Sequence, residues 1–350
     1  MTIPAEVEIE GVQVGGDHAT YVIAEVGLAH DGSLGSALAF VDAAAQTGVQ
    51  AVKFQTHIPE AESTVRERFR VPVFPQDQTR FDYWKRTAFS LAQWQQIQSR
   101  ARTHGLSFLS SPFSLEAVDL LMEVGVPAWK VGSGEVSNLP LLDRMADTGL
   151  PILLSSGMSD WAELDRCAKL LDSARAPWML FQCTSRYPCP PEEWGLNLIP
   201  EMSARYGVPV GFSDHSGRVA AGIAARVMGA SAVEVHLTFH RQAFGPDVPA
   251  SLTPEELSQL VADLDAVDRA RSHPVSKDAA AAEFSGMREL FTKSIVAARD
   301  LRDGHLLEGG DMALKKPGDG LPPEMMKGLV GRVLRRSVKL DERILQEDLE

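Results

Sequence analysis

Two histidines follow apolar segments of the chain at an interval of one repeating structural unit. His215 ends "VPVGFSDH" and His236 lies in "SAVEVHLT", 21 residues later. Neighbouring strands of a sheet lie about 5 Å apart, so both imidazoles can reach one divalent ion. Such an ion accepts imidazole together with carboxylate or water. Because the spacing matches no helical zinc motif, two hydrogen-bonded histidines without a metal remain the alternative.

Two lysines and a set of serines lie at the ends of other apolar segments. Lys53 is in "AVKFQTH" and Lys130 is in "PAWKVGSGE". A buried ammonium group is costly unless it meets an anion, and serine hydroxyls could complete a phosphate site. The serines at comparable positions are Ser111, Ser133, Ser155, Ser185 and Ser213. A rival interpretation is that one lysine forms a Schiff base with a keto acid, as in class I aldolases.

Three further side chains are candidates for a polar pocket. Glu25, in "YVIAEVGL", could act as a general base or as a partner of a metal-bound water. It could also simply pair with one of the two lysines. Asp247, in "FGPDVPASL", could bind substrate hydroxyls, but a role in shaping its Gly-Pro-Asp turn is favoured. Tyr187 could form a pocket wall or only pack against its neighbours.

These residues lie on a regular alternation of short β-branched segments and longer amphipathic segments. Eight strands are expected, at 21–28, 51–57, 106–112, 127–135, 151–157, 177–185, 208–215 and 231–238. A helical pattern follows each of them. Alternation of this kind predicts a parallel sheet, and eight units over about 270 residues fit a closed (β/α)₈ TIM-type barrel. No G-x-G-x-x-G follows the first strand, which weakens the rival open dinucleotide-binding sheet.

The barrel prediction also places the candidate residues. In such barrels active groups lie at the carboxyl ends of the strands, which is where the polar residues gather in this sequence. We expect the barrel to span 1–271, a linker to span 272–286 and a small, mainly β domain to span 287–350. A domain of that size is marginal alone, so it is expected to lean on another surface.

Composition limits the classes of partner. The formal net charge of −13 argues against a broad contact with nucleic acid or an anionic membrane. Three cysteines are no disulfide framework and favour a reducing compartment. The first residues lack the pattern of a signal peptide, and the sequence has no apolar run of 18 residues. A cytoplasmic protein is therefore expected.

Eight segments, in order, carry a resemblance to a known family. They are "IAEVGLAHDG", "AVKFQTH", "FLSSPF", "WKVGSGEVSNLPLL", "LSSGM", "CTSRYP", "GFSDHSG" and "GPDVPASL". Together they resemble the sialic acid synthase (N-acetylneuraminate synthase-like) family over nearly the whole chain. The tail, with "VAARDLRDGHLL" and "KKPGDGLPPEMMKGLVG", is similar to that family's C-terminal antifreeze-like (SAF) domain.

The resemblance implies condensation of phosphoenolpyruvate with an open-chain amino sugar, giving a nine-carbon 2-keto-3-deoxy acid and phosphate. It implies Mn²⁺, or alternatively Mg²⁺ or Co²⁺, bound by His215 and His236. The residues carried over as phosphoenolpyruvate ligands are Lys53, Ser111, Lys130, Ser133, Ser155, Ser185 and Ser213. Those carried over as facing the sugar are Glu25, Gln55, Tyr187 and Asp247. A domain-swapped homodimer, in which the C-terminal domain covers the partner's barrel, is also implied.

The sequence departs from the family pattern at four places. Glu-Lys-His is usual where this chain has Val235 in the middle position, and the Lys-Arg-Pro-Gly of the C-terminal domain has Lys316 in place of arginine. That arginine meets the sugar's N-acyl group, and lysine lacks its planar fork. At 29–32 this chain has Ala-His-Asp-Gly where the family usually has Asn-His-Asn-Gly, and Arg186 in "TSRYP" is also less usual for the family. The sugar, a hexose or an acylated hexosamine, therefore stays open, as does a non-catalytic sugar-binding descendant.

Overall fold

Eight parallel strands form a closed barrel in the computed structural model, which describes residues 6–71 and 74–350. The strands are β3 (Tyr21–Gly27), β4 (Ala51–Thr56), β5 (Ser107–Pro112), β6 (Trp129–Val131), β7 (Ile152–Ser155), β8 (Trp178–Cys183), β9 (Val210–Asp214) and β10 (Ala232–Leu237). They pair in chain order, and β10 pairs with both β9 and β3, so the sheet closes on itself. The short β11 (Ser251–Leu252) adds to β10. The predicted (β/α)₈ fold is confirmed.

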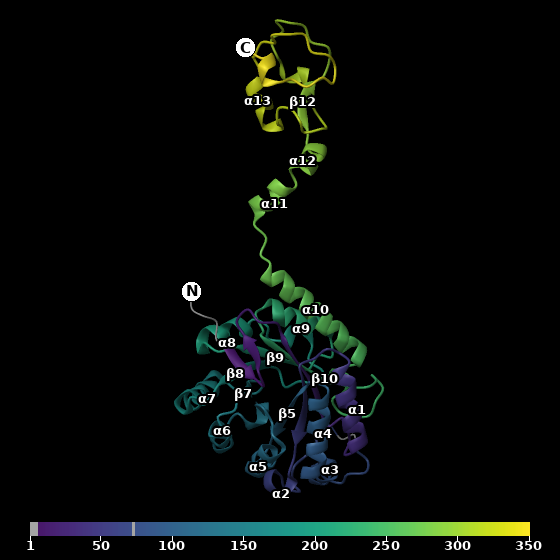
Figure 1. The fold of residues 1–350 in the computed structure, drawn as a ribbon, viewed down its shortest axis with the longest axis vertical. Coiled ribbons are helices and arrows are strands. Elements are labelled where there is room, and N and C mark those ends of the chain that lie inside the picture. The colour runs from purple at the N-terminus through teal and green to yellow at the C-terminus, as the bar shows by residue number, and fades with distance from the viewer. Residues whose placement is uncertain (1–5, 72–73) are drawn as a thin grey trace. The chain divides into compact units, whose positions relative to one another are not determined.

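Helices surround the barrel in the order predicted from the sequence (Figure 1). They are α1 (Leu34–Ala45), α4 (Leu91–Thr103), α5 (Leu115–Val124), α6 (Leu139–Ala146), α7 (Trp161–Ala174), α8 (Leu198–Tyr206), α9 (Val219–Val227) and α10 (Pro254–Ser272). Several begin at polar caps: Ser90, for example, accepts a hydrogen bond from the Gln93 backbone N–H. The predicted strand at 127–135 is shorter than expected, because a 3₁₀ turn at Ser133–Glu135 follows β6.

Side-chain alternation along the strands divides the core in two. Outward-facing residues such as Val22 and Val52 pack beneath the helices. Inward-facing residues fill one end of the barrel with apolar side chains, among them Tyr21, Ile23, Leu109, Leu153 and Met179. The inward positions that follow along each strand are polar, so the opposite end of the barrel carries the candidate site.

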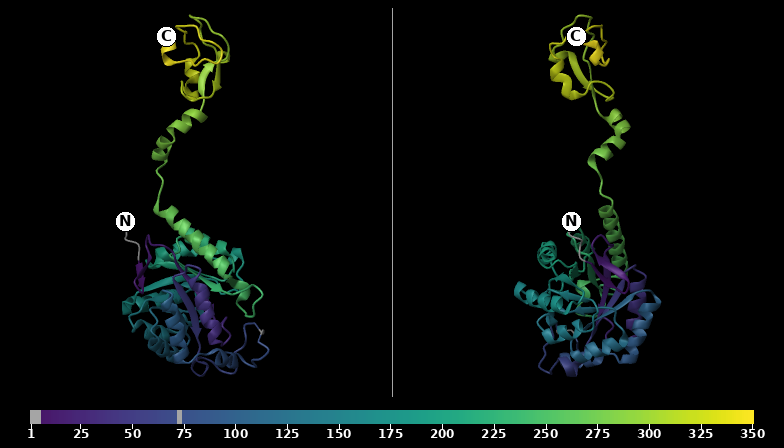
Figure 2. Two further views of the ribbon diagram at one scale, coloured as in Figure 1. Left: turned by 45° about the vertical axis from the view of Figure 1, so that its right-hand side comes forward. Right: turned by 60° about the vertical axis from the view of Figure 1, so that its left-hand side comes forward.

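A hairpin that the sequence analysis did not predict closes the apolar end. It consists of β1 (Glu6–Ile9) and β2 (Val12–Gly15). Its residues Val7, Ile9 and Val14 join the interior cluster. In both views of Figure 2 the hairpin lies at the end of the barrel opposite the segment that follows β4. In the part of the chain that the structure describes, the hairpin therefore covers the apolar end, and ligands would reach the interior from the carboxyl ends of the strands.

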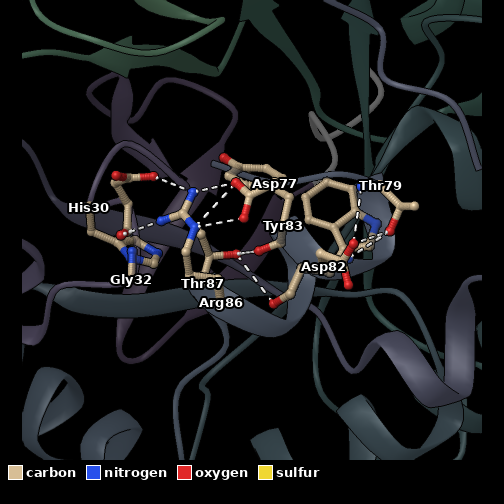
Figure 3. Close-up of polar contacts among 10 residues, drawn as sticks. His30, Gly32, Asp77, Thr79, Asp82, Tyr83, Arg86 and Thr87 are labelled. Atoms are coloured by element: carbon tan, nitrogen blue, oxygen red, sulfur yellow. Dashed lines mark hydrogen bonds and ion pairs between the residues drawn. The ribbon is translucent and has the colours of Figure 1, made fainter. Parts of the chain in front are cut away.

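The segment after β4 folds over that open end. It contains α2 (Pro59–Glu62) and α3 (Arg80–Thr87). Figure 3 shows Arg86 of α3 between Asp77 and the turn that follows β3. Its Nη2 lies 2.8 Å from Asp77 and 2.9 Å from Asp31. In the same turn Gly32 has a φ of +79°, and a Cβ there would lie 2.5 Å from the Arg86 carbonyl oxygen. Only glycine suits both constraints.

The second compact unit comprises His273–Glu350. Its first part, within the expected linker, forms α11 (Lys277–Glu283), and α12 (Ser285–Phe291) follows. Beyond these, β12 (Ser294–Ala297) pairs antiparallel with β13 (Met312–Lys315), and α13 (Met326–Leu329) follows. The core of the unit is small and apolar, with Ile295, Leu307, Leu334 and Ile344 among its buried residues.

Among the residues that the structure describes, no helix is both long and apolar enough to cross a lipid bilayer.

Candidate active site

Four charged side chains alternate in sign inside the polar end of the barrel. Lys53 Nζ lies 2.8 Å from Glu25 Oε2 and 3.8 Å from Glu234 Oε1. Lys130 Nζ lies 3.7 Å from the same Glu234 oxygen. All four side chains are at least nine-tenths buried. The predicted inward orientation of Glu25, Lys53 and Lys130 agrees with this geometry. Glu25 forms an ion pair with Lys53, as the simpler of its two interpretations expected.

The two lysines differ in their electrostatics. Burial alone would lower the pKa of Lys53, but the carboxylates of Glu234 and Glu25 outweigh it and raise the pKa. Burial lowers the pKa of Lys130, and the carboxylate of Glu234 does not offset it. Lys53 is therefore a fixed cation, and Lys130 is the ammonium that gains most from the arrival of an anion.

The predicted serines surround these ammonium groups. Lys130 Nζ donates to Ser155 Oγ, and Ser213 Oγ donates to Glu234 Oε1 at 3.2 Å. Ser111 on β5 is buried and lies in register with Gln55 on β4. Gly157, which has no side chain, leaves the space between Ser133 and Ser185 open. A Cβ on Gly157 would lie 2.6 Å from Ser133 Oγ and 2.5 Å from Ser185 Oγ.

The two histidines lie side by side at the same end of the barrel. Their ring centroids are 5.5 Å apart, and His236 lies in register with Glu25. His215 Nδ1 donates to the Thr184 carbonyl oxygen at 2.8 Å, and the Tyr187 hydroxyl lies 2.8 Å from His215 Nε2. Burial and the neighbouring His236 lower the pKa of His215 to about 3. His215 is therefore neutral, with the lone pair of Nε2 facing Tyr187.

This donor set suits a divalent ion with two protein ligands. A ligating histidine commonly donates its other ring N–H to a carbonyl, as His215 does to Thr184. Nearby, Glu234 Oε2 is buried and has no hydrogen-bond partner, so it could hold a water bound to such an ion. No group of three or more His, Cys, Asp or Glu side chains in the described residues forms a ready metal cage. Substrate and water would complete the coordination.

Val235 points away from this site, as the alternation predicts. It is buried in the layer between the sheet and the helices and lies in register with Asp214 of β9. Asp214 accepts hydrogen bonds from the backbone N–H and the hydroxyl of Ser216, both at 2.9 Å. Burial raises the pKa of Asp214 to about 6. A lysine at position 235 would stand beside this carboxylate, and valine supplies no charge there.

A cleft of about 500 Å³ opens above the charged groups. Six of the predicted residues line it: Gln55, Ser133, Ser185, Tyr187, His236 and Asp247. Asp247 does more than shape its turn, because it forms an ion pair with Arg70. Arg70 in turn lies over the Tyr187 ring, 4.1 Å from its centroid. Tyr187 therefore forms a wall of the cleft as well as a partner of His215.

The sequence analysis missed the contribution of the segment after β4. That segment supplies Arg70, Arg80 and Trp84 to the cleft, and His57 at the end of β4 also lines it. The segment is rich in charged and aromatic residues, and nothing in its local sequence indicates where it folds. Lys316 belongs to the C-terminal unit, where its Nζ lies 5.1 Å from the centroid of the Phe291 ring.

Comparisons with known proteins agree with the geometry. A model of the NeuB family matches residues 40–276, and a model of the SAF domain matches residues 292–350. The chain is 30% identical to an N,N'-diacetyllegionaminic acid synthase of Campylobacter jejuni, over 93% of this chain and 98% of the relative. It is 32% identical to the human N-acetylneuraminate-9-phosphate synthase, over 99% of this chain and 97% of that protein.

Solved structures give the same result. The crystal structure of an N-acetylneuraminic acid (sialic acid) synthetase from Leptospira borgpetersenii, in complex with citrate, is similar with a TM-score of 0.73 and 28% sequence identity. The match covers 81% of this chain and 97% of that one.

Proposed function

The chain belongs to the NeuB family, and on that premise we propose that it condenses phosphoenolpyruvate with the open-chain form of a sugar, giving a nine-carbon 2-keto-3-deoxy acid and phosphate. The observation that carries the proposal is the meeting, at one end of the barrel, of two buried ammonium groups, serine hydroxyls and two imidazoles below an open cleft. These are the groups that an enol phosphate and a polar aldehyde require.

The lysines and serines bind and orient the enol phosphate. Lys53 and Lys130 neutralise its phosphate and carboxylate, and the hydroxyls around Gly157 donate to the phosphate oxygens. C3 of phosphoenolpyruvate then attacks the aldehyde carbon and forms the new C–C bond, water adds at C2, and the C–O bond to phosphate breaks. Holding both reactants together removes much of the entropic barrier.

Glu25 is placed to handle a proton. One of its carboxylate oxygens accepts from Gln55 Nε2 at 2.9 Å and the other lies 2.8 Å from Lys53 Nζ. The hydrogen bond and the ion pair hold the carboxylate between Lys53 and Gln55, and Gln55 lines the cleft. We assign Glu25 to holding the water that adds at C2 or to accepting its proton.

We propose a divalent cation, Mn²⁺ in the first place and Mg²⁺ or Co²⁺ as alternatives, at His215 and His236. When bound, it supplies Lewis-acid polarisation of the aldehyde oxygen. The neutral state of His215 and its N–H···O bond to Thr184 support this assignment.

For the acceptor, we propose a neutral acylated hexosamine in preference to a phosphorylated sugar. The two arginines of the cleft already have acidic partners: Arg70 pairs with Asp247, and Arg80 lies 3.3 Å from Glu67. A phosphate dianion would have to displace one of these carboxylates. Aromatic and apolar side chains line much of the remaining wall, and they suit acyl or methyl groups; they include Phe69, Phe74, Tyr83, Trp84 and Phe113.

A homodimer, with each C-terminal unit covering the barrel of its partner, is proposed as the working assembly. The small second unit exposes several large apolar side chains on one short helix, including Met287, Leu290 and Phe291, which are 55%, 67% and 64% exposed. Such side chains favour burial against a second surface. Light scattering of the full chain tests the oligomeric state.

The test of function is phosphate release from phosphoenolpyruvate across a panel of hexoses, acylated hexosamines and their 6-phosphates, with Mn²⁺ or with EDTA. We expect release with a neutral acylated hexosamine and loss of turnover in EDTA. If none of the sugars in the panel supported phosphate release, the proposal would be overturned. The depressed pKa of Lys130 favours one second candidate, a Schiff-base aldolase. Borohydride with a keto acid would trap a covalent adduct only in that case.

A further inference from the structure

His57 is enclosed in a way that its place at the end of a barrel strand does not require. Its ring is stacked between Trp84, at 3.8 Å and 9° between planes, and Phe113, at 4.2 Å and 10°. The three rings come from separate segments: the end of β4, helix α3 and the loop after β5. Only 6% of His57 is exposed. Two parallel aromatic faces are a favourable environment for a cationic ring.

Both nitrogens of this ring meet oxygen atoms. Nδ1 lies 2.6 Å from Glu62 Oε1, and Nε2 lies 3.4 Å from Gln55 Oε1. The Gln55 amide has one direction, because its Nε2 donates to Glu25 at 2.9 Å. Its oxygen therefore faces the imidazole, and an amide oxygen only accepts. His57 Nε2 must carry a hydrogen for this contact to be favourable, and Nδ1 must carry one to bond the Glu62 carboxylate.

Glu62 is built to be the counter-ion. Its side chain is 7% exposed, and its second oxygen, Oε2, is buried without a hydrogen-bond partner. A buried carboxylate with one lone partner depends on the charge of that partner. This ion pair is the first of a series of contacts. His57 contacts Gln55, Gln55 donates to Glu25, and Glu25 pairs with Lys53.

We propose that His57, carrying hydrogens on both ring nitrogens and paired with Glu62, is a positioning residue that fixes the direction of the Gln55 amide and, through it, the Glu25 carboxylate. Without the hydrogen on Nε2, two lone pairs would face each other. The Gln55 amide would then turn and bring its oxygen against the Glu25 carboxylate, which repels it. The inference rests on the proposed function for the statement that Glu25 faces the reacting sugar, and on the geometry alone for the state of His57.

The kinetic test compares two variants in the full-length protein. His57→Phe keeps the aromatic stack and removes both nitrogens, and Glu62→Gln keeps an acceptor for Nδ1–H but removes the counter-charge. We expect kcat for phosphate release to fall about 10- to 100-fold in His57→Phe and less in Glu62→Gln, with KM for phosphoenolpyruvate changed less than about threefold. The matched control is His104→Phe, a part-exposed histidine bonded to Asp42 outside the site, which should keep wild-type kcat.

A purely structural role for His57 predicts a different outcome. The stacked phenyl ring would then support wild-type kcat, and that result would overturn the proposal. Circular dichroism shows whether each variant is folded, and Glu62→Gln, which leaves the stack intact, is informative even where His57→Phe is not.

The second measurement needs no turnover. Histidine side-chain ¹⁵N spectra of the whole protein in neutral buffer should contain a signal from a ring with both nitrogens protonated that vanishes in His57→Phe and persists in His104→Phe, which separates it from the signals of the other histidines that contact carboxylates. A bare Nε2 on His57 would overturn the proposal, whatever the sugar panel shows. If no sugar supports phosphate release while the ring is doubly protonated, the proposed function fails and the positioning geometry stands.

Discussion

The barrel mouth and the C-terminal unit both bury carboxylates against cations, but they treat the carboxylate oxygens differently. Asp311 of the C-terminal unit accepts from the Glu308 backbone N–H at 2.9 Å, from His305 at 2.7 Å and from Arg299 at 2.9 Å. In the barrel, Glu234 uses one oxygen toward Ser213 and both lysines, while the other is buried with no hydrogen-bond partner.

The fully bonded arrangement of Asp311 occurs a second time in the C-terminal unit. Asp348 ends a second 3₁₀ turn like that of Asp311, and it accepts from the Leu345 backbone N–H and from Arg336, each at 2.9 Å. Saturated networks of this kind hold a shape. An unsaturated buried network keeps donors and acceptors available to a ligand. The number of hydrogen bonds on each buried carboxylate therefore distinguishes the groups that stabilise the fold from the groups that remain available to bind a substrate.

The largest effect, on the rate of phosphate release, is expected when one cation and one anion of the barrel network are removed together. The double variant Lys130→Met/Glu234→Gln takes out one charge of each sign, so no uncompensated ion is left behind. Phosphate release should fall about 10³-fold or more, because both anion binding and charge stabilisation are lost. The free energy of unfolding should stay within about 1 kcal/mol of wild type or rise.

Tryptophan fluorescence during urea unfolding reports this directly, since all six tryptophans lie within residues 84–194 of the barrel. The distinction between the two regions would be wrong if the free energy of unfolding fell by as much as the transition-state free energy calculated from the fall in rate.

The second prediction removes charge from the saturated network. Asp311→Asn should destabilise the C-terminal unit by about 3 kcal/mol, because it breaks a buried, multiply bonded ion pair. The C-terminal unit has no tryptophan, so hydrogen exchange of peptides from 292–350 is the measurement. Asp300→Asn is the control: its carboxylate is 63% exposed and accepts from Lys339 and from the Leu340 backbone N–H. Asparagine keeps an oxygen for the backbone bond, and water screens the lost ion pair, so exchange in this region should stay near wild type.

The same carboxylate sets a pH dependence. Burial alone would raise the pKa of Asp311, but hydrogen bonds from His305, the Glu308 backbone N–H and Arg299 hold it below its usual value of 3.8. Its contribution is therefore complete above the unfolded-state pKa and is lost as the pH falls through the folded-state pKa. Protection of the unit should fall in acid, and Asp311→Asn should flatten that fall. Equal acid sensitivity in wild type and variant would contradict the assignment.

The third prediction tests whether a departure from the family pattern left a carboxylate unpaired. Val235→Lys places an ammonium beside Asp214, whereas Val233→Lys places one opposite Phe212 on the same buried face. An unpaired buried ion costs several kcal/mol, so Val235→Lys should be less destabilising than Val233→Lys by about 2 kcal/mol. Urea unfolding followed by fluorescence compares the two. Equal losses would show that Asp214 is not a partner for position 235.

How much of this contrast could be predicted from the sequence depends on the range of each interaction. Alternation along a strand is local, so the inward placement of Lys53 and Glu25, and the outward placement of Val235, followed from spacing alone. The Arg70–Asp247 pair joins residues 177 positions apart, and the stack around His57 joins three segments, so neither has a local signature. The hairpin β1–β2 was missed because a strand pair of four residues each gives too short a periodic pattern.

The smallest effect is expected for an ion pair that is closer than those of Lys53 and Lys130 but lies in solvent. Arg144 Nη2 is 2.7 Å from Asp119, and the two side chains are 43% and 62% exposed. Water solvates both groups equally well in the folded and unfolded chain, so Arg144→Gln should change the free energy of unfolding by less than about 0.5 kcal/mol. Urea unfolding at low and moderate salt measures it. A cost above about 1 kcal/mol would mean that distance alone, rather than burial and the saturation of each oxygen, decides what an ion pair contributes, and the comparison between the two regions would then lose its physical basis.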